Sequence, residues 1–374
     1  MRKVAQPPLF GDNFLMNETI SLIIPTYNER DNITPLLKRL ERALAGYNYE
    51  VVFIDDNSAD GTAEVATSLA DKYPVRVIVR KDKRGLASAV VDGLSHVSGK
   101  IIAVMDADLQ HPPEVLPDLL KEIEKGADIV IASRYVKGGS CLGWSLSRKL
   151  NSRGAIFLAH LLLPATRRVS DPMSGFFMFS KEAVAEAKLK PLGYKILLEI
   201  LIAGKFKRVA EVPYTFGIRG RGESKLSAGQ QMAYLRHLFS LMKRSGELAR
   251  FLKFSLVGIS GVGVNMGLLW LLTELGGLFY LASAAIGIET SIITNFILNN
   301  YFTFADRSQP GVKSFLNRLL KFNMVSLAGL AINLAILWFL TEVPGVFYLL
   351  SNLVGIAAAT LWNYLANNWW TWKP

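Results

Sequence analysis

The sequence predicts an α/β domain with a mostly parallel sheet, followed by an all-α transmembrane domain. In the first part, short β-branched runs alternate with stretches of helical periodicity, a pattern typical of strand–helix–strand units. Beyond residue 253, apolar stretches long enough to cross a bilayer follow one another. A chain of 374 residues has room for both domains.

The composition agrees with a membrane protein. Lys and Arg number 42 against 31 Asp and Glu, a net charge of +11, while 51% of residues are hydrophobic and 20% charged. A basic and apolar chain suits anionic lipids or phosphate ligands. The sequence has no zinc-finger, homeodomain or RNA-recognition pattern, so we do not expect a nucleic acid partner. Cys141 is the single cysteine, which excludes an intrachain disulfide and fits a reducing compartment.

The α/β domain is expected over residues 20–227. Residues 1–19 are interpreted as a flexible extension, because Pro7, Pro8 and Gly11 interrupt them before an apolar signal core can form. A helix is expected to begin near Pro112, because proline fits the first helical turn. The β-branched runs predict strands at 20–27, 49–56, 75–81, 101–108 and 128–135.

Two carboxylates and an amide stand where the fourth expected strand ends. If the backbone stays extended, Asp106, Asp108 and Gln110 project to the same side. Two acids and an amide oxygen suit a hard cation such as Mg²⁺ or Mn²⁺, which leaves positions for phosphate oxygens. The polar clusters at 25–29 and 54–61 end other strands, and such ends share one crevice in an open α/β sheet.

The membrane domain is expected over residues 254–374 and contains an internal repeat. Residues 251–274 align without gaps on 319–342, pairing for example Asn265 with Asn333. Each copy holds two spans, so the repeat is parallel. Buried helices of a soluble protein would need polar faces that these segments mostly lack. The expected spans are 254–273, 283–302, 322–341 and 349–366.

The distribution of basic residues predicts the orientation in the membrane. The turns at 274–282 and 342–348 contain no Lys or Arg, whereas the connection at 303–321 is basic. Both termini and the α/β domain are therefore expected in the cytoplasm, at the cell membrane. The segments 144–168 and 228–253 are amphipathic and basic, and we interpret them as helices on the membrane surface. Solvated helices that pack on the sheet remain the alternative.

Several motifs in order resemble the family 2 glycosyltransferases, and most closely the dolichyl-phosphate mannose synthases. The motifs are PTYNE, DD-x-S-x-D-G-T, DADLQHPPE, SRY-x-x-GG, D-P-M-S-G-F and GESKL. The resemblance covers roughly residues 20–250 and implies a GT-A fold, which is Rossmann-like. The membrane half resembles the GtrA-like four-helix domain of archaeal members of this group.

The resemblance implies roles for individual residues. Asp106, Asp108 and Gln110 would bind the metal, Mg²⁺ or Mn²⁺, and with Arg134 they would form the catalytic set. The diphosphate would be held by Arg219 and Lys225, which lie in a glycine-rich segment that could close over an anion. The acceptor phosphate would be bound by Arg134, Arg148 and Ser152, the last two one helical turn apart. The sugar nucleotide would be bound by Pro25, Tyr27, Glu29, Ile54, Asp56, Met105, Asp106, Ala107, Asp108 and Gln110 as well.

The implied reaction is an inverting, metal-dependent transfer of mannose from GDP-mannose to dolichyl phosphate, which gives dolichyl phosphate mannose for glycosylation. UDP-glucose is an alternative donor for the same site. Asp171 and Glu199 are further acids that a mechanism could use, but a lipid phosphate is already anionic, so we expect Asp171 to orient groups. A lipid-sugar translocase or scaffold is the rival class, motivated by polar residues in the spans: Asn265, Glu289, Asn295, Asn333 and Asn363.

Overall fold

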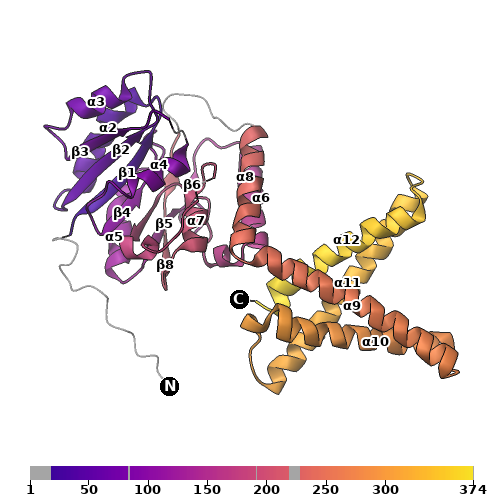
Figure 1. Cartoon of the computed structure of the whole chain (residues 1–374). Helices are drawn as coiled ribbons and strands as arrows, with labels where there is room; N and C mark the ends of the chain where they lie inside the picture. The colour runs from indigo at the N-terminus through magenta and orange to yellow at the C-terminus, as the bar shows by residue number, and fades with distance from the viewer. Residues whose placement is uncertain (1–17, 83–84, 191, 219–227, 374) are drawn as a thin grey trace. The chain divides into compact units, whose positions relative to one another are not determined.

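The computed structural model describes residues 18–82, 85–190, 192–218 and 228–373 (Figure 1). The chain divides into two compact units, Met1–Leu241 and Met242–Pro374, and each is described by itself.

The first unit is built on a seven-stranded sheet in the order β3-β2-β1-β4-β7-β5-β8. All neighbouring strands are parallel except β7, which runs antiparallel to β4 and β5. The mostly parallel sheet is thereby confirmed. The strands are β1 Ile20–Thr26, β2 Tyr49–Asp55, β3 Val75–Val79, β4 Ile101–Val104, β5 Ile129–Ser133, β7 Phe177–Ser180 and β8 Val209–Pro213, and a separate parallel pair joins β6 Ser140–Cys141 to β9 Thr215–Phe216.

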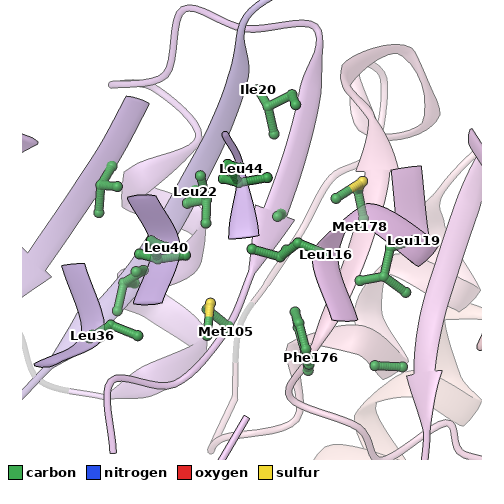
Figure 2. Close-up of a cluster of buried hydrophobic side chains, with 14 of the residues drawn as sticks. Ile20, Leu22, Leu36, Leu40, Leu44, Met105, Leu116, Leu119, Phe176 and Met178 are labelled. Atoms are coloured by element: carbon green, nitrogen blue, oxygen red, sulfur yellow. The ribbon is translucent and has the colours of Figure 1, made fainter. Parts of the chain in front are cut away.

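Helices cover both faces of this sheet. Side chains alternate between the faces of a strand, so Leu22 and Ile24 pack with one set of helices while Ile23 packs with the other. Leu36, Leu40 and Leu116 lie in the first cluster, together with Met105 and Phe176 (Figure 2). The helices of the first face are α2 Arg30–Ala43, α3 Thr62–Ser68 and α5 Leu116–Glu124, and those of the second are α4 Leu86–Gly93 and α7 Ile196–Ala203.

The strand β4 is shorter than expected. The sequence predicts a strand over 101–108, but the structure ends it at Val104. Leu109 has a φ of +62°, a left-handed conformation that an extended strand cannot contain. The following helix begins where the prolines predict, with a 3₁₀ turn at Pro113–Val115 that leads into α5.

The two amphipathic segments form α6, Leu146–Leu162, and α8, Ala228–Arg244. The Tyr234 hydroxyl donates a hydrogen bond to the Ala155 carbonyl at 2.6 Å, which joins α8 to α6. A new helix begins at Glu247 after Gly246, so residues 247–253 belong to the first long helix of the second unit. Shorter 3₁₀ helices lie at Pro164–Arg168 and Lys181–Val184. The exposed apolar side chains of α6 and α8 are Leu146, Leu150, Phe157, Met232, Leu235 and Phe239.

The second unit contains four helices long and apolar enough to cross a membrane, as the sequence predicts. They are longer than the apolar stretches because their polar ends remain helical. The helices are α9 Glu247–Trp270, α10 Tyr280–Leu298, α11 Val312–Glu342 and α12 Tyr348–Ala366. Single π-helical turns follow at Leu271–Leu275, Asn299–Thr303 and Asn367–Thr371, with a 3₁₀ turn at Ala305–Arg307.

The internal repeat is visible in how asparagines pack on glycines within each hairpin. A Cβ atom at Gly261 of α9 would lie 2.3 Å from Nδ2 of Asn295 in α10. The same arrangement recurs in the second hairpin, where a Cβ at Gly329 of α11 would lie 2.4 Å from Oδ1 of Asn363 in α12. A second set of close approaches joins Asn265 to Gly287 and Asn333 to Gly355. These four asparagines of the spans therefore pack in the contacts between paired helices.

Candidate active site

The loop after β4 carries the acidic residues expected at the metal and the donor. Asp106, Asp108 and Gln110 all line one cavity of about 810 Å³ in the first unit. The expected reason for this convergence was wrong, because β4 ends before Asp106 and extended geometry does not last to Gln110. Leu109, between Asp108 and Gln110, has a left-handed conformation, so the three side chains reach the cavity from a loop and not from a strand.

Hydrogen bonds fix the conformation of this acidic loop. The backbone N–H of Gln110 donates to Oδ1 of Asp108 at 3.1 Å, and its side-chain amide donates to the Gly217 carbonyl at 2.9 Å. The Gly217 N–H donates back to the Gln110 carbonyl at 2.9 Å. Asp108 and Gln110 are buried, as are the Met105 and Ala107 side chains on either side of Asp106, whereas the Asp106 side chain is 32% exposed. The loop is thus set before any ligand arrives.

The acidic loop fits a divalent metal that brings part of its own coordination shell. In the part of the chain that the structure describes, no group of three or more His, Cys, Asp or Glu side chains is placed to hold a metal ion. Asp106 and Asp108 offer two carboxylates in one cavity. Mg²⁺ is commonly bound by one or two carboxylates, with water and substrate phosphates as its other ligands.

Arg134 and Asp171 form a two-point ion pair in the same region. The guanidinium donates from Nε to Oδ2 at 2.7 Å and from Nη2 to Oδ1 at 2.8 Å. Burial opposes the charge of Arg134, but hydrogen bonding and charge from Asp171 raise its pKa above the ordinary value. Asp171 is fully buried, and its backbone N–H donates to Glu211 at 3.1 Å. Asp171 therefore orients Arg134, in agreement with the orienting role expected for this acid.

The helix α6 brings Arg148 and Ser152 to the cavity that Arg134 also lines. The Ser152 hydroxyl accepts a hydrogen bond from the Tyr135 hydroxyl at 2.8 Å. The Arg148 guanidinium lies 4.3 Å from the centre of the Trp144 ring, and that of Arg134 lies 5.4 Å from it. One indole thus supports both arginines through cation–π contacts. The three residues expected at the acceptor phosphate lie in one cavity with the acidic loop.

His111 is a cavity residue that the sequence analysis did not single out. It follows Gln110 directly in the motif DADLQHPPE, which was the available signal. Its Nδ1 accepts a hydrogen bond from the Asp106 backbone N–H at 3.0 Å, and its ring stacks on Phe176. Burial lowers the pKa of His111 to about 4, so it is neutral at physiological pH and positions Asp106 through the backbone.

Lys195 also lines the cavity without having been expected there. Its Nζ donates to the Met173 carbonyl at 2.8 Å. Burial, together with the nearby charge of Arg134, lowers the pKa of Lys195 to about 8. The residue precedes α7 in a segment with no motif, so only the tertiary structure reveals its place.

The residues expected to hold the nucleoside lie at the ends of β1 and β2, outside the described lining of this cavity. The Ile54 side chain is fully buried in the core, so only its backbone could face a ligand. Asp56 accepts hydrogen bonds from Arg80 Nε at 2.8 Å and from the Gly85 N–H at 2.7 Å. Tyr27 is exposed, Pro25 is half-buried, and Glu29 accepts a hydrogen bond from Asn32.

Two other residues from the sequence analysis cannot be placed, and a third, Glu199, is absent from the described lining of the cavity. Arg219 and Lys225, expected at the diphosphate, lie outside the described residues. Glu199 is fully buried and contacts Nε2 of His237 at 3.1 Å. This pair joins α7 to α8, which is a structural contact between helices.

Two families match the chain in sequence. Residues 21–187 match the family described as glycosyl transferase family 2. Residues 253–372 match the GtrA/DPMS transmembrane domain, which makes the chain an integral membrane protein.

Curated relatives extend this similarity over nearly the whole chain. The chain is 49% identical over 353 residues to a dolichol-phosphate mannosyltransferase of Pyrococcus furiosus, covering 94% of this chain and 99% of the relative. It is 40% identical to a dolichol-phosphate mannosyltransferase of Mycosarcoma maydis, covering 65% of this chain and 85% of that one. A dolichol-phosphate mannosyltransferase of Saccharomyces cerevisiae is 39% identical, with 60% of this chain and 88% of the relative covered.

Among solved structures, glucosyl-3-phosphoglycerate synthase from Mycobacterium tuberculosis, in complex with Mn²⁺, UDP-glucose and phosphoglyceric acid, superposes with a TM-score of 0.48 at 21% identity. The match covers 65% of this chain and 86% of that one. The same enzyme with Mg²⁺ and UDP superposes with a TM-score of 0.47 at 21% identity, covering 61% of this chain and 79% of that one.

Proposed function

Because the chain belongs to the dolichol-phosphate mannosyltransferases of glycosyl transferase family 2, we propose that it transfers mannose from GDP-mannose to dolichyl phosphate with inversion at the sugar C1. The single observation that carries the proposal is the shared cavity of the first unit. Asp108 and Asp106 line it with negative charge, and Arg134 and Arg148 line it with positive charge. A metal-bound diphosphate suits the acidic loop, and a lipid phosphate suits the arginines.

The chemistry needs little proton transfer. An oxygen of the lipid phosphate forms the new bond to C1 as the bond from C1 to the donor diphosphate breaks, and the electron pair leaves with GDP. A phosphate monoester has a second pKa of about 6, so the nucleophile is already anionic at neutral pH. Asp171 is engaged by Arg134 and is not required as a base. Arg134 and Arg148 orient the phosphate, and Lys195 adds positive charge below its pKa of about 8.

We further propose Mg²⁺ or Mn²⁺ as the cofactor. Asp106 and Asp108 would hold the ion, with Gln110 beside them in the same loop. When bound there, the ion would supply positive charge to offset the negative charge of the diphosphate. We assign Arg219 and Lys225 to the same diphosphate and Pro25, Tyr27, Glu29, Ile54 and Asp56 to the nucleoside, with the side chain of Ile54 in the core.

Donor profiling tests the proposal. The purified full-length protein in detergent is given dolichyl phosphate and Mn²⁺ with radiolabelled GDP-mannose or UDP-glucose, and label is counted in the extracted lipid. We expect label from GDP-mannose, and its loss with EDTA. Faster transfer from UDP-glucose would show that UDP-glucose is the donor, while glycosyl transfer to a lipid phosphate would stand. Absence of transfer from every nucleotide sugar would overturn the proposed activity.

A lipid-sugar translocase or scaffold is the weaker candidate. Its motive was the polar residues of the spans, but the asparagines among them close the helix contacts of each hairpin at glycines such as Gly261 and Gly329. A packing role therefore accounts for these asparagines. A lipid-flipping assay in vesicles without nucleotide sugar separates the two classes, and transport without transfer would favour the translocase.

For the orientation, we propose that both termini and the catalytic unit face the cytoplasm. The support is the basic segment 303–321 between the second and third apolar stretches, which contains Arg307 before α11 and Lys313 and Arg318 near the start of α11, in agreement with the positive-inside rule. Single cysteines in a Cys141-free background test it. Residue 310 should react with a membrane-impermeant reagent only after the cells are opened, whereas residue 277 should react in intact cells. The reverse pattern would invert the topology.

A further inference from the structure

A second cavity lies wholly within the four-helix unit, and nothing in the proposed reaction uses it. It has a volume of about 360 Å³ and is formed where α11 begins and where the π-helical turn after α12 ends. The described lining contains no acidic residue. It consists of Arg307, Gln309, Ser314, Asn317, Arg318, Lys321, Trp369, Trp370, Thr371 and Lys373.

The internal repeat allows the charged residues of this cavity to be compared with the equivalent residues of the first copy. Arg250 in the first copy corresponds to Arg318 in the second. Arg250 is neutralised, because it pairs with Glu247 at 2.5 Å and with Asp306 at 2.7 Å. The position equivalent to Glu247 is occupied by Phe315 in the second copy.

Arg318 consequently meets neutral partners. Its Nε donates to Oδ1 of Asn300 at 3.0 Å, its Nη1 to the Ser314 hydroxyl at 2.7 Å and its Nη2 to the Gln309 carbonyl at 2.9 Å. Within the described ranges no carboxylate pairs with Arg318, although its residue is only 7% exposed. A buried cation without a counter-charge is costly, so the cavity favours an anion.

Other lining groups have the chemistry to bind a phosphate. Lys321 lies one turn beyond Asn317 on α11, with its Nζ 5.5 Å from the centre of the Trp370 ring. The Thr371 hydroxyl is buried and has no hydrogen-bond partner among the described residues. A phosphate accepts charge-assisted hydrogen bonds from Arg and Lys and ordinary ones from a hydroxyl.

The position of the cavity identifies the source of that phosphate. The cavity is at the ends of two membrane-spanning helices, and tryptophans such as Trp369 and Trp370 are typical of the headgroup level. We infer that this cavity binds the phosphate headgroup of an anionic membrane lipid. All of the lining residues belong to the second unit, and none of them is among the residues assigned above to the donor or the acceptor.

Native mass spectrometry of the full-length protein in detergent tests the inference, with dioleoyl phosphatidic acid as the probe and dioleoyl phosphatidylcholine as the zwitterionic comparison. The double variant Lys321→Gln, Lys373→Gln should bind phosphatidic acid about tenfold more weakly than the wild type, since two cations of the cavity are lost. The matched control is Lys253→Gln, because Lys253 is the repeat equivalent of Lys321 and lies 4.7 Å from the Phe302 ring centre. This control should bind like the wild type.

Three outcomes would overturn the inference: equal affinity of the double variant and the wild type, an equal loss in Lys253→Gln, or binding of phosphatidylcholine as tight as that of phosphatidic acid. Arg318→Gln is a second variant, used only where its thermal unfolding matches the wild type, because Arg318 also joins Asn300 to Gln309. A further arm separates two sources of the lipid phosphate. In an Arg148→Ala background, displacement of phosphatidic acid by dolichyl phosphate assigns the cavity to a prenyl lipid, and its failure assigns the cavity to a bilayer phospholipid.

Discussion

The carboxylate of Asp171 binds Arg134 twice over, through the guanidinium at 2.7 Å and through the backbone N–H of the same residue at 3.1 Å. Side chain and main chain of Arg134 are therefore fixed by one buried group. A lipid phosphate bound as proposed would meet a guanidinium that is already oriented.

Asp171→Asn should reduce kcat/KM for dolichyl phosphate about ten- to a hundredfold, because a charge-assisted hydrogen bond contributes about 1.5 to 3 kcal/mol. The KM for GDP-mannose should change little. Steady-state kinetics with both substrates varied would measure this. Asp118→Asn is the control, since Asp118 pairs with Lys121 at an exposed surface site. An equal loss for donor and acceptor would contradict the orienting role.

Asp108→Ala should lower transfer at least about a hundredfold while the protein stays folded, because it removes a carboxylate that we assign to the metal and diphosphate. Calorimetry should show that GDP no longer binds more tightly when Mn²⁺ is added. A folded variant that keeps both turnover and Mn²⁺-dependent GDP binding would remove Asp108 from the metal site.

Arg148→Ala should weaken use of dolichyl phosphate by roughly ten- to a hundredfold, again from one lost charge-assisted contact. Donor affinity should hardly change. Arg153 lies on the same helix, is exposed and is absent from the described lining of the cavity, so Arg153→Ala is the matched control. A similar defect in both variants would indicate a general effect of surface charge.

We expect kcat/KM for the acceptor to fall at alkaline pH because Lys195 loses its proton there. Its pKa falls from the ordinary 10.5 to about 8, so the side chain loses its positive charge as pH rises through 8, and kcat/KM for the acceptor should fall there. Lys195→Met should lose this pH dependence, and Lys195→Arg should move it to higher pH. The effect on stability has the opposite sign, because the unfolded state holds the proton up to about pH 10.5, so the free energy of unfolding rises between these values. An unchanged profile in Lys195→Met would exclude the assignment.

Gly329→Ala should destabilise the second hairpin by about 1 to 3 kcal/mol, because the new methyl group would overlap the Asn363 side chain. Gly263→Ala is the control, since a Cβ there has nothing within 4 Å. Thermal unfolding of the detergent-purified proteins would compare them. Equal transition temperatures would mean that Asn363 moves aside at no cost.

Much of the fold could be predicted because hydrophobic patterns report it directly. The strands β1, β2, β3 and β5 and the four long helices lie close to where β-branched runs and apolar stretches placed them. The strand β7 was not anticipated, because it is a short, fully buried apolar segment without alternation, and its antiparallel direction depends on its neighbours.

The sequence predicted which residues form much of the candidate site, but it predicted only in part how the backbone places them. The motif letters indicated Asp106, Asp108 and Gln110, yet the loop that holds them, with its left-handed residue Leu109, has no signature in the hydrophobic pattern. Lys195 reaches the cavity from a segment distant in sequence, which no local signal reports. Likewise, the sequence shows that asparagines lie within the apolar spans. Only the packed structure shows that these asparagines face glycines of the neighbouring helix.

The pairing of asparagine with glycine inside each hairpin also bears on how the protein is made. Asn295 meets Gly261 and Asn363 meets Gly329, so each polar amide packs against the helix that precedes it in the chain. As synthesis proceeds, a hairpin can shield its own amides before the other hairpin exists. Each helical pair is therefore suited to leave the insertion machinery for the lipid as a preassembled unit.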